Sequence, residues 1–300
     1  MKYYPIPGKC WHTLKSLFAS TRFPLVATLF LMTACTASKD DPKPVIDPPV
    51  PAYRLDYEVS WTADNPDVKD KTHYIYNNAG QLVRIASIDA NRLNDTSYYN
   101  FAFEYDSKGT VVERRVRYPA NDPYRKYVYR TSGNQILMNI YTFDGAFDYA
   151  DKYYLNEVNQ PIYMNDTTVA QANQYSKLTW TETDVREFTN YRWNGTAHYA
   201  FSNSKYTYDP TRFNPYYIAR INWQRGISDF GIMNYSNFSQ HIIKKQEGKY
   251  FDNDLSYTRN FEWTFSPEGL PIKCTQTETS SLHPDKVLTT YFEYYFSARQ

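Results

Sequence analysis

The feature that most constrains the fold of this chain is a short sequence unit that recurs from residue 74 onward. Most copies have two aromatic residues with one residue between them, then a turn-forming residue, two further residues, a glycine and an apolar stretch. Short runs of aromatic and apolar residues on either side of a turn-forming segment predict a β-hairpin. The copies are YIYNNAGQLVRI (74–85), FEYDSKGTVVER (103–114), YVYRTSGNQILM (127–138), YYLNEVNQPIYM (153–164), YTYDPTRFNPYYI (206–218) and WTFSPEGLPIKC (263–274).

The glycine of the unit indicates how each turn is made. The Asn, Asp or Ser that begins a turn can hydrogen-bond to nearby backbone, and glycine adopts a left-handed conformation that side chains resist. We therefore predict turn glycines at Gly80, Gly109, Gly133 and Gly269, with Asn159 in the glycine position of another copy.

The segment YRLDYEVSWT, residues 53–62, alternates with a period of two. Tyr53, Leu55, Tyr57, Val59 and Trp61 fall on one face, and polar residues fall on the other. This alternation is a strong strand signal. Because a transmembrane barrel needs an apolar outer face, the pattern predicts a soluble sheet.

Units spaced by roughly 20 to 30 residues predict an all-β, antiparallel, up-and-down meander of about 14 to 17 strands. Side chains cannot fill a closed barrel of ~16 strands. The alternatives are a barrel around a loop or cavity, a flattened barrel, or a strongly curled open sheet. We expect a curled, barrel-like sheet whose aromatic face points inward. Only SNFSQHIIKKQ, residues 236–246, also admits a short helix.

The N-terminal region predicts export. Residues 1–22 carry four basic and no acidic residues, and the apolar stretch FPLVATLFLMTA (23–34) leads to Cys35. This is the layout of a secretory signal, and the stretch is too short to cross a membrane as a helix. MTAC, residues 32–35, resembles the lipobox of bacterial lipoproteins, which implies a signal peptide over 1–34 and an acylated Cys35. The alternative is an ordinary cleaved signal with a chance cysteine.

A charged and proline-rich stretch follows over residues 35–52. Lys39, Asp40 and Asp41 resemble the acidic surface-export tag of Bacteroidota lipoproteins, although a solvated linker is the alternative reading. Five prolines between residues 42 and 51 predict a stiff, extended spacer. The expected organisation is signal peptide, linker, and one all-β domain over 53–300, held at the outer membrane by its lipid and exposed at the cell surface.

The charge of the chain gives no sign of a nucleic acid partner, and its cysteine content gives no sign of an internal disulfide. The net charge is +1, from 33 basic and 32 acidic residues, and no basic stripe suggests a nucleic acid partner. Once Cys10 leaves with the signal and Cys35 is acylated, Cys274 has no disulfide partner. Cys274 alternates in phase with Leu270 and Ile272, which indicates a core residue rather than a reactive thiol.

The sequence shows no catalytic signature. HExxH, CxxC, GxSxG, P-loop and GxGxxG motifs do not occur. We therefore expect no metal, no cofactor and no enzymatic activity. The histidines after the signal are far apart, at His73, His198, His241 and His283.

Two further residue groups are candidates for binding. The acidic runs FDGAFDYAD (143–151) and FDNDL (251–255) do not match a calcium loop, and solvated hairpin loops are the expected reading, with calcium as the alternative. Tryptophans stack on sugar rings if exposed, and otherwise belong to a β core. They are Trp61, Trp180, Trp193, Trp223 and Trp263.

The hairpin unit resembles the YD repeat. With the lipobox, YTYDPTRFNPYY (206–217) and WTFSPEGLPIK (263–273), the chain resembles the domain-of-unknown-function 4595 family of Bacteroidota lipoproteins. The resemblance covers residues 53 to 300. It implies a porin-like fold and no catalytic residues.

Two functional hypotheses follow. A surface-displayed module that binds a glycan or a protein partner predicts a cavity or groove lined by aromatics. A structural or assembly accessory of the cell envelope predicts a filled interior and an apolar outer patch. Apart from such a glycan or envelope protein, the lipid anchor makes the membrane the expected partner.

Overall fold

The computed structural model describes residues 53–88, 99–117, 125–164, 174–218 and 239–299. Cys35, Lys39, Asp40, Asp41 and Trp223 lie outside the described residues, as do the predicted signal peptide and linker.

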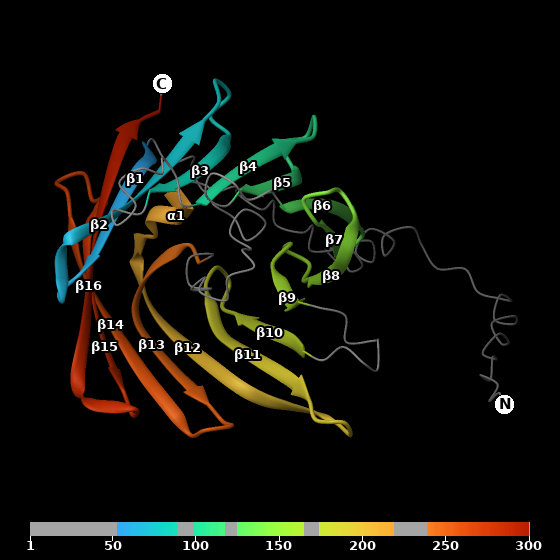
Figure 1. The fold of residues 1–300 in the computed structure, drawn as a ribbon. Coiled ribbons are helices and arrows are strands. Elements are labelled where there is room, and N and C mark those ends of the chain that lie inside the picture. Colours follow the sequence, from blue (N-terminus) through green and yellow to red (C-terminus); the bar gives the residue numbers. More distant parts are fainter. Residues whose placement is uncertain (1–52, 89–98, 118–124, 165–173, 219–238, 300) are drawn as a thin grey trace, which may run out of the picture. The chain divides into compact units, whose positions relative to one another are not determined.

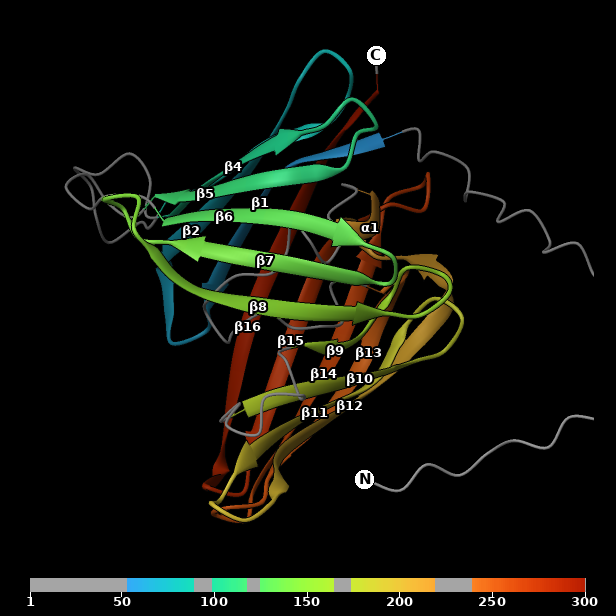
Figure 2. The same cartoon turned by 90° about the vertical axis from the view of Figure 1, so that its right-hand side faces the viewer.

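The described residues form one closed barrel of sixteen antiparallel strands and one short helix (Figures 1 and 2). Each strand pairs with its neighbours in sequence, and β1 pairs with β16 to close the ring. This confirms the predicted all-β meander and excludes the open curled sheet, because a closed barrel has no open edge. The elements are β1 Tyr53–Thr62, β2 Asn65–Tyr76, β3 Leu82–Ile88, β4 Tyr99–Tyr105, β5 Val111–Arg117, β6 Arg125–Ser132, β7 Gln135–Tyr141, β8 Phe147–Leu155, β9 Pro161–Met164, β10 Gln174–Trp180, β11 Val185–Trp193, β12 His198–Phe213, α1 Pro215–Ile218, β13 His241–Tyr250, β14 Leu255–Phe265, β15 Pro271–Ser280 and β16 His283–Ala298.

The tight turns are made by the chemistry of the repeated unit. Between β2 and β3, the Asn77 side chain accepts hydrogen bonds from the backbone N–H groups of Ala79 and Gln81, at 3.0 and 2.9 Å. Gly80 then has a φ of +73°, where a side chain would be strained. The other turn residues have positive φ values as well: Gly109 (+77°), Gly133 (+56°), Gly269 (+84°) and Asn159 (+60°).

The copy at 206–218 is not a hairpin, which corrects the prediction. Residues 206–213 all belong to β12, and the chain then forms α1. Asp209 binds the backbone N–H of Thr211 at 3.0 Å, and the pairing with β13 is irregular between Asp209 and Phe213. Asn214 caps α1, because its side-chain oxygen accepts the backbone N–H of Tyr216 at 2.9 Å. A proline at the first helical position completes this helix start.

The segment 236–246 is strand where the structure describes it. Residues 241–246 begin β13, which pairs with β12 on one side and with β14 on the other. Ladder hydrogen bonds on both sides satisfy the backbone, which a short helix would do only in part. Residues 236–238 lie outside the described residues.

The main apolar cluster lies inside the ring. It unites buried side chains of β1 to β8, β15 and β16, and Tyr216 of α1 packs against it. Figure 1 shows α1 within the ring of strands. Its fully buried members include Leu55, Tyr127 and Ile140. Tyrosines such as Tyr127 thus point inward as expected.

A bulge in β1 divides the predicted aromatic face. The register with β16 shifts between Leu55 and Tyr57, and the side-chain alternation changes phase there. Leu55 therefore faces inward, whereas Tyr57 faces outward and stacks on Tyr295 at 4.2 Å between ring centroids. The same shift turns Glu58 inward.

The outer face of the barrel carries ion pairs between neighbouring strands. Arg115 of β5 contacts Glu104 of β4 at 2.7 Å, and Glu113 of β5 contacts Lys126 of β6 at 3.0 Å. A lipid-facing surface would be destabilised by charges at such positions. In the described ranges, no helix is both long and apolar enough to span a membrane.

Candidate functional site

A cavity of about 290 Å³ lies between α1 and the inner faces of β13 to β16. The last four strands are consecutive neighbours in the barrel, and α1 precedes them in the order of elements along the chain. The cavity is lined by Asn214, Tyr216, Ile243, Arg259, Phe261, Trp263, Cys274, Gln276, Phe292 and Tyr294.

One wall of the cavity is aromatic. Tyr294 lies in the middle of this wall, because the Trp263 and Phe292 rings both stack on it, at 5.7 and 6.4 Å between ring centroids. The Tyr216 ring of α1 meets Tyr294 edge-on at 6.2 Å. The Trp263 indole N–H donates to the Ile243 carbonyl at 2.7 Å, which fixes the ring. Such a preformed aromatic wall offers flat apolar surfaces to a ligand.

Polar side chains gather at the other end of the cavity. The Arg259 Nε–H donates to Glu278 at 2.6 Å, and another guanidinium N–H donates to Gln246 at 3.3 Å. The Gln246 amide in turn donates to the Tyr257 hydroxyl at 3.0 Å. These partners fix the orientation of the Arg259 guanidinium, and Arg259 lines the cavity together with Gln276.

A glycine in β13 makes room for this polar end. A Cβ on Gly248 would lie 2.2 Å from the Tyr257 ring, far inside van der Waals contact. Glycine therefore lets the Tyr257 ring lie across β13, where its hydroxyl also meets Ser204 at 3.1 Å. This is a strand position where another group approaches the backbone closely.

The half-buried carboxyl of Glu58 lies directly behind the aromatic wall. The Tyr216 hydroxyl donates to Glu58 at 2.8 Å, and Tyr74 hydrogen-bonds to the same carboxyl. Burial raises the pKa of Glu58 from 4.5 to about 7, and the two tyrosine hydrogen bonds lower it in part. Burial also raises the pKa values of Tyr74, Tyr216 and Tyr294 well above 10, so they stay protonated donors.

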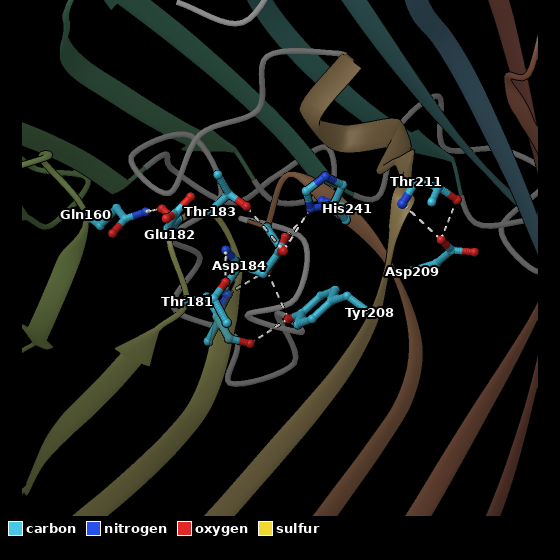
Figure 3. A network of polar contacts seen from close by, with 11 residues as sticks. Gln160, Thr181, Glu182, Thr183, Asp184, Tyr208, Asp209, Thr211 and His241 are labelled. Atoms are coloured by element: carbon cyan, nitrogen blue, oxygen red, sulfur yellow. Dashed lines mark hydrogen bonds and ion pairs between the residues drawn. The ribbon is translucent and has the colours of Figure 1, made fainter. Parts of the chain in front are cut away.

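A second polar network lies where the β10–β11 turn meets the start of β13 (Figure 3). Asp184 accepts the backbone N–H of His241 at 2.9 Å, and its other oxygen lies 2.8 Å from the His241 Nδ1. Buried Ser239 accepts the Val185 N–H at 2.9 Å and donates to Tyr208 at 2.9 Å.

The Ser239 contacts decide how this network should be read. A catalytic serine needs a hydrogen bond to a histidine base, whereas the Ser239 hydroxyl donates to Tyr208. We therefore interpret the Asp184–His241 pair as a fastening that holds the start of β13 against β11.

The tryptophans named from the sequence separate into different environments. Trp263 lines the cavity. Trp61 faces outward, stacks on Tyr291 at 5.4 Å, and lies under the Lys69 ammonium at 4.5 Å. Trp180 donates its indole N–H to Pro161 at 2.8 Å. Trp193 meets His198 at 5.0 Å.

The acidic runs and the histidines do not converge. Asp144 accepts from Thr142 within its own turn, Asp252 lies 3.4 Å from Arg192, and Asp254 lies 2.8 Å from Lys249. Asp148 faces Arg125 at 3.9 Å, whereas burial raises the pKa of Asp151 to about 6. Among the residues that the structure describes, no three acidic, His or Cys side chains form a group able to hold a metal.

Sequence reasoning missed most of the cavity residues. On β14, Arg259 shares the inward phase with Phe261 and Trp263, and on β15 Gln276 and Glu278 share it with Cys274. Polar residues that interrupt an inward face in this way were an available signal. Cys274 lies in the core beside them, as its alternation predicts. Glu58 left no usable signal, because the β1 bulge reverses its apparent face.

Comparisons with known proteins show the fold only. No family model matches the chain, and no curated protein matches it. A solved structure of a porin-like protein from Bacteroides uniformis superposes with a TM-score of 0.52 at 11% identity, covering 83% of this chain and 98% of that one. A porin-like protein from Bacteroides vulgatus gives a TM-score of 0.42 at 11% identity, covering 81% and 98%. The chain is thus similar in fold to the Bacteroides uniformis porin-like protein.

Proposed function

We propose that the barrel is a binding protein of the cell envelope that takes a sugar residue of a glycan into the cavity beside α1. One observation carries this proposal: the cavity joins an aromatic wall at Trp263 and Tyr294 to hydrogen-bonding groups at Arg259 and Gln276. A sugar ring has an apolar C–H face and a polar hydroxyl edge, and this arrangement complements both.

The size of the cavity favours a glycan over a protein partner. A volume of about 290 Å³ lies at the lower end of the range of small-molecule sites. One sugar ring enters such a space, whereas a protein interface needs ~800 Å² of surface on each partner. We propose binding rather than catalysis, because the Ser239 hydroxyl near the Asp184–His241 pair donates to Tyr208.

A calorimetric titration with a glycan panel tests the proposal. Gln276→Ala removes a polar group from the cavity, and Thr275→Ala alters the next residue of β15, which faces outward. We expect Gln276→Ala to weaken binding about tenfold, the equivalent of ~1.4 kcal/mol, and Thr275→Ala to leave it unchanged. Equal loss in both variants, or no glycan binding by the native protein, would refute the proposed site.

The lipid anchor and the cellular location of the domain belong to the same proposal. We propose that Cys35 is acylated and that Lys39, Asp40 and Asp41 direct the domain to the outer surface of the outer membrane. The resemblance to the domain-of-unknown-function 4595 family and the fold match with the Bacteroides uniformis protein support this location. Loss of palmitate labelling in Cys35→Ser tests the anchor. Protease shaving of intact cells, with and without alanine at the three tag residues, tests surface exposure.

An apolar rim gives some support to the alternative, an assembly accessory. Tyr250 and Phe251 of the β13–β14 hairpin and Leu282, Val287 and Leu288 of the β15–β16 hairpin are 40–65% exposed. The two hairpins are joined, because the Ser281 N–H donates to the Ser256 carbonyl at 2.9 Å. Leu282→Ser with Val287→Ser would abolish envelope crosslinks if this rim docks a partner, and would leave glycan binding intact.

A further inference from the structure

The charge of the cavity indicates which class of sugar it takes. Among the described residues that line the cavity, Arg259 is the one charged side chain. Its guanidinium is paired with Glu278 at 2.6 Å, and the two side chains are 31% and 20% exposed. Such a partly buried, short and charge-assisted contact is stronger than an exposed ion pair. The polar end of the cavity is therefore electrically neutral.

An acidic ligand would bind here at a disadvantage. To pair with Arg259, its carboxylate would have to share the guanidinium with Glu278 at close range, and like charges at close range repel. A second carboxyl, Glu58, lies behind Tyr216 on the other side of the cavity. A cationic sugar would meet the guanidinium itself and would have no free carboxylate along the lining.

An uncharged sugar suits the same groups without such a conflict. Guanidinium N–H groups of Arg259 donate to hydroxyl oxygens, and the Gln276 amide both donates and accepts. The C–H face of the ring would pack against Trp263 and Phe292 on the aromatic wall. No ligand charge then has to be desolvated, which is a cost that buried ion pairs often fail to recover.

Resting on the proposed function, we infer that the cavity selects neutral hexose residues and discriminates against uronic acids, with Arg259 and Glu278 as the residues that set this specificity. The substitution Glu278→Gln tests the charge of this pair, because it keeps the shape of the side chain and removes its negative charge. The outward-facing and exposed Glu262 on β14 provides the matched control, Glu262→Gln.

Isothermal titration tests the inference on the full chain, with disaccharides of glucose, galactose and mannose and the uronic acid counterpart of each. We expect a neutral disaccharide to bind at least about tenfold more tightly than its acidic counterpart. In Glu278→Gln the gap should close or reverse, because Arg259 becomes free to pair with the ligand carboxylate. Glu262→Gln should keep the native preference, and thermal melts of all three proteins establish that they fold.

The outcomes separate the two proposals. If uronic acids bind the native protein as tightly as the neutral sugars or more so, the inference is wrong and the proposed glycan function stands. If the native preference persists unchanged in Glu278→Gln, the ion pair does not set the specificity, which also overturns the inference. If no sugar of either class binds at about 10 mM, a concentration that reveals even millimolar affinities, the proposed function itself fails.

Discussion

Replacing Glu58 by Gln should make the protein more stable in mildly alkaline solution, although the carboxyl makes two hydrogen bonds. The glutamine oxygen still accepts from the Tyr216 hydroxyl, which now lies 2.8 Å from the carboxyl. What the substitution removes is a negative charge behind the aromatic wall. Because the carboxyl is half-buried and its pKa is raised, the folded state disfavours that charge.

The sign and size of this stability difference follow from the coupling between protonation of Glu58 and folding. The pKa of Glu58 is about 7 in the folded protein and 4.5 for an ordinary glutamate. The stability that the neutral carboxyl allows is fully present below pH 4.5 and is lost as the pH rises through about 7. A shift of this size corresponds to at most about 3 kcal/mol. Glu58→Gln should therefore match the native protein near pH 4.5 and exceed its stability by up to that amount above about pH 8.

Other titrating groups do not obscure the comparison. Burial raises the pKa of Asp151 to about 6, which adds a loss of the same sign at lower pH. The pKa of Glu293 is lowered, chiefly by its hydrogen bond to Lys273, and its contribution is lost as the solution becomes acidic. Both groups are present in the native protein and in Glu58→Gln, so the difference between their unfolding free energies isolates Glu58.

Urea unfolding at several pH values from about 4.5 to 9 gives this difference directly. Glu262→Gln serves as the control, because its side chain is exposed on the outer face, and its curve should follow the native one. A constant difference between Glu58→Gln and the native protein across the whole range would refute the reasoning. So would a variant that loses stability as the pH rises.

Four further predictions concern other parts of the barrel. Gly248→Ala should lower the free energy of unfolding by about 1–3 kcal/mol in urea titrations, because the new Cβ overlaps the Tyr257 ring; a neutral result would show that the ring moves aside. Arg114→Met should raise the melting temperature, since this guanidinium is fully buried and its three nitrogens have no hydrogen-bond partner in the described part of the chain; a drop in melting temperature would show that its contacts with the Tyr127 and Phe101 rings, at 4.1 and 6.0 Å from the ring centroids, outweigh the cost of burial. Asp184→Ala should cost about 2–3 kcal/mol through its lost buried hydrogen bonds, and a loss below about 0.5 kcal/mol, the range of ordinary surface substitutions, would contradict the fastening role. Cys274, whose thiol pKa is raised by burial, should react with a thiol reagent only after denaturant is added; labelling of the native protein would contradict its core position.

Strands and turns were predictable because their determinants are local. The Asn77 side chain binds the N–H groups of Ala79 and Gln81 within one turn, so a few consecutive letters encode the whole interaction. The alternation of each strand likewise needs only its own residues. Closure of the sheet was left open, since the pairing of β1 with β16 joins residues more than 200 positions apart.

The two fold errors have identifiable causes. In the copy at 206–218, the Asn-Pro pair at 214 and 215 is a helix start signal, and it was read as part of a turn. In β1, one extra residue between Leu55 and Tyr57 reverses the faces of the strand. No residue type marks such a bulge, because the register with a distant partner strand determines it.

The site was hidden for a related reason. Arg259 and Glu278 lie on adjacent strands, and each alone reads as an ordinary charged strand residue. Only the register that sets them opposite one another, together with the inward phase shared with Phe261, shows a neutral pair inside the barrel. The sequence supported the expectation of an aromatic binding surface, but the polar half of the cavity required the paired sheet.

The position of the cavity follows from how unevenly a wide barrel is filled. Sixteen strands enclose more space than their own side chains occupy. On β2 to β8, large apolar side chains such as Tyr127 and Ile140 meet in one buried cluster. On β14 and β15, the inward residues Arg259, Cys274 and Gln276 lie beside Phe261 and Trp263, and these residues line the cavity together with α1. A cavity in this half is therefore a consequence of the inward residues themselves, and substitutions that enlarge them should close it without disturbing the ring.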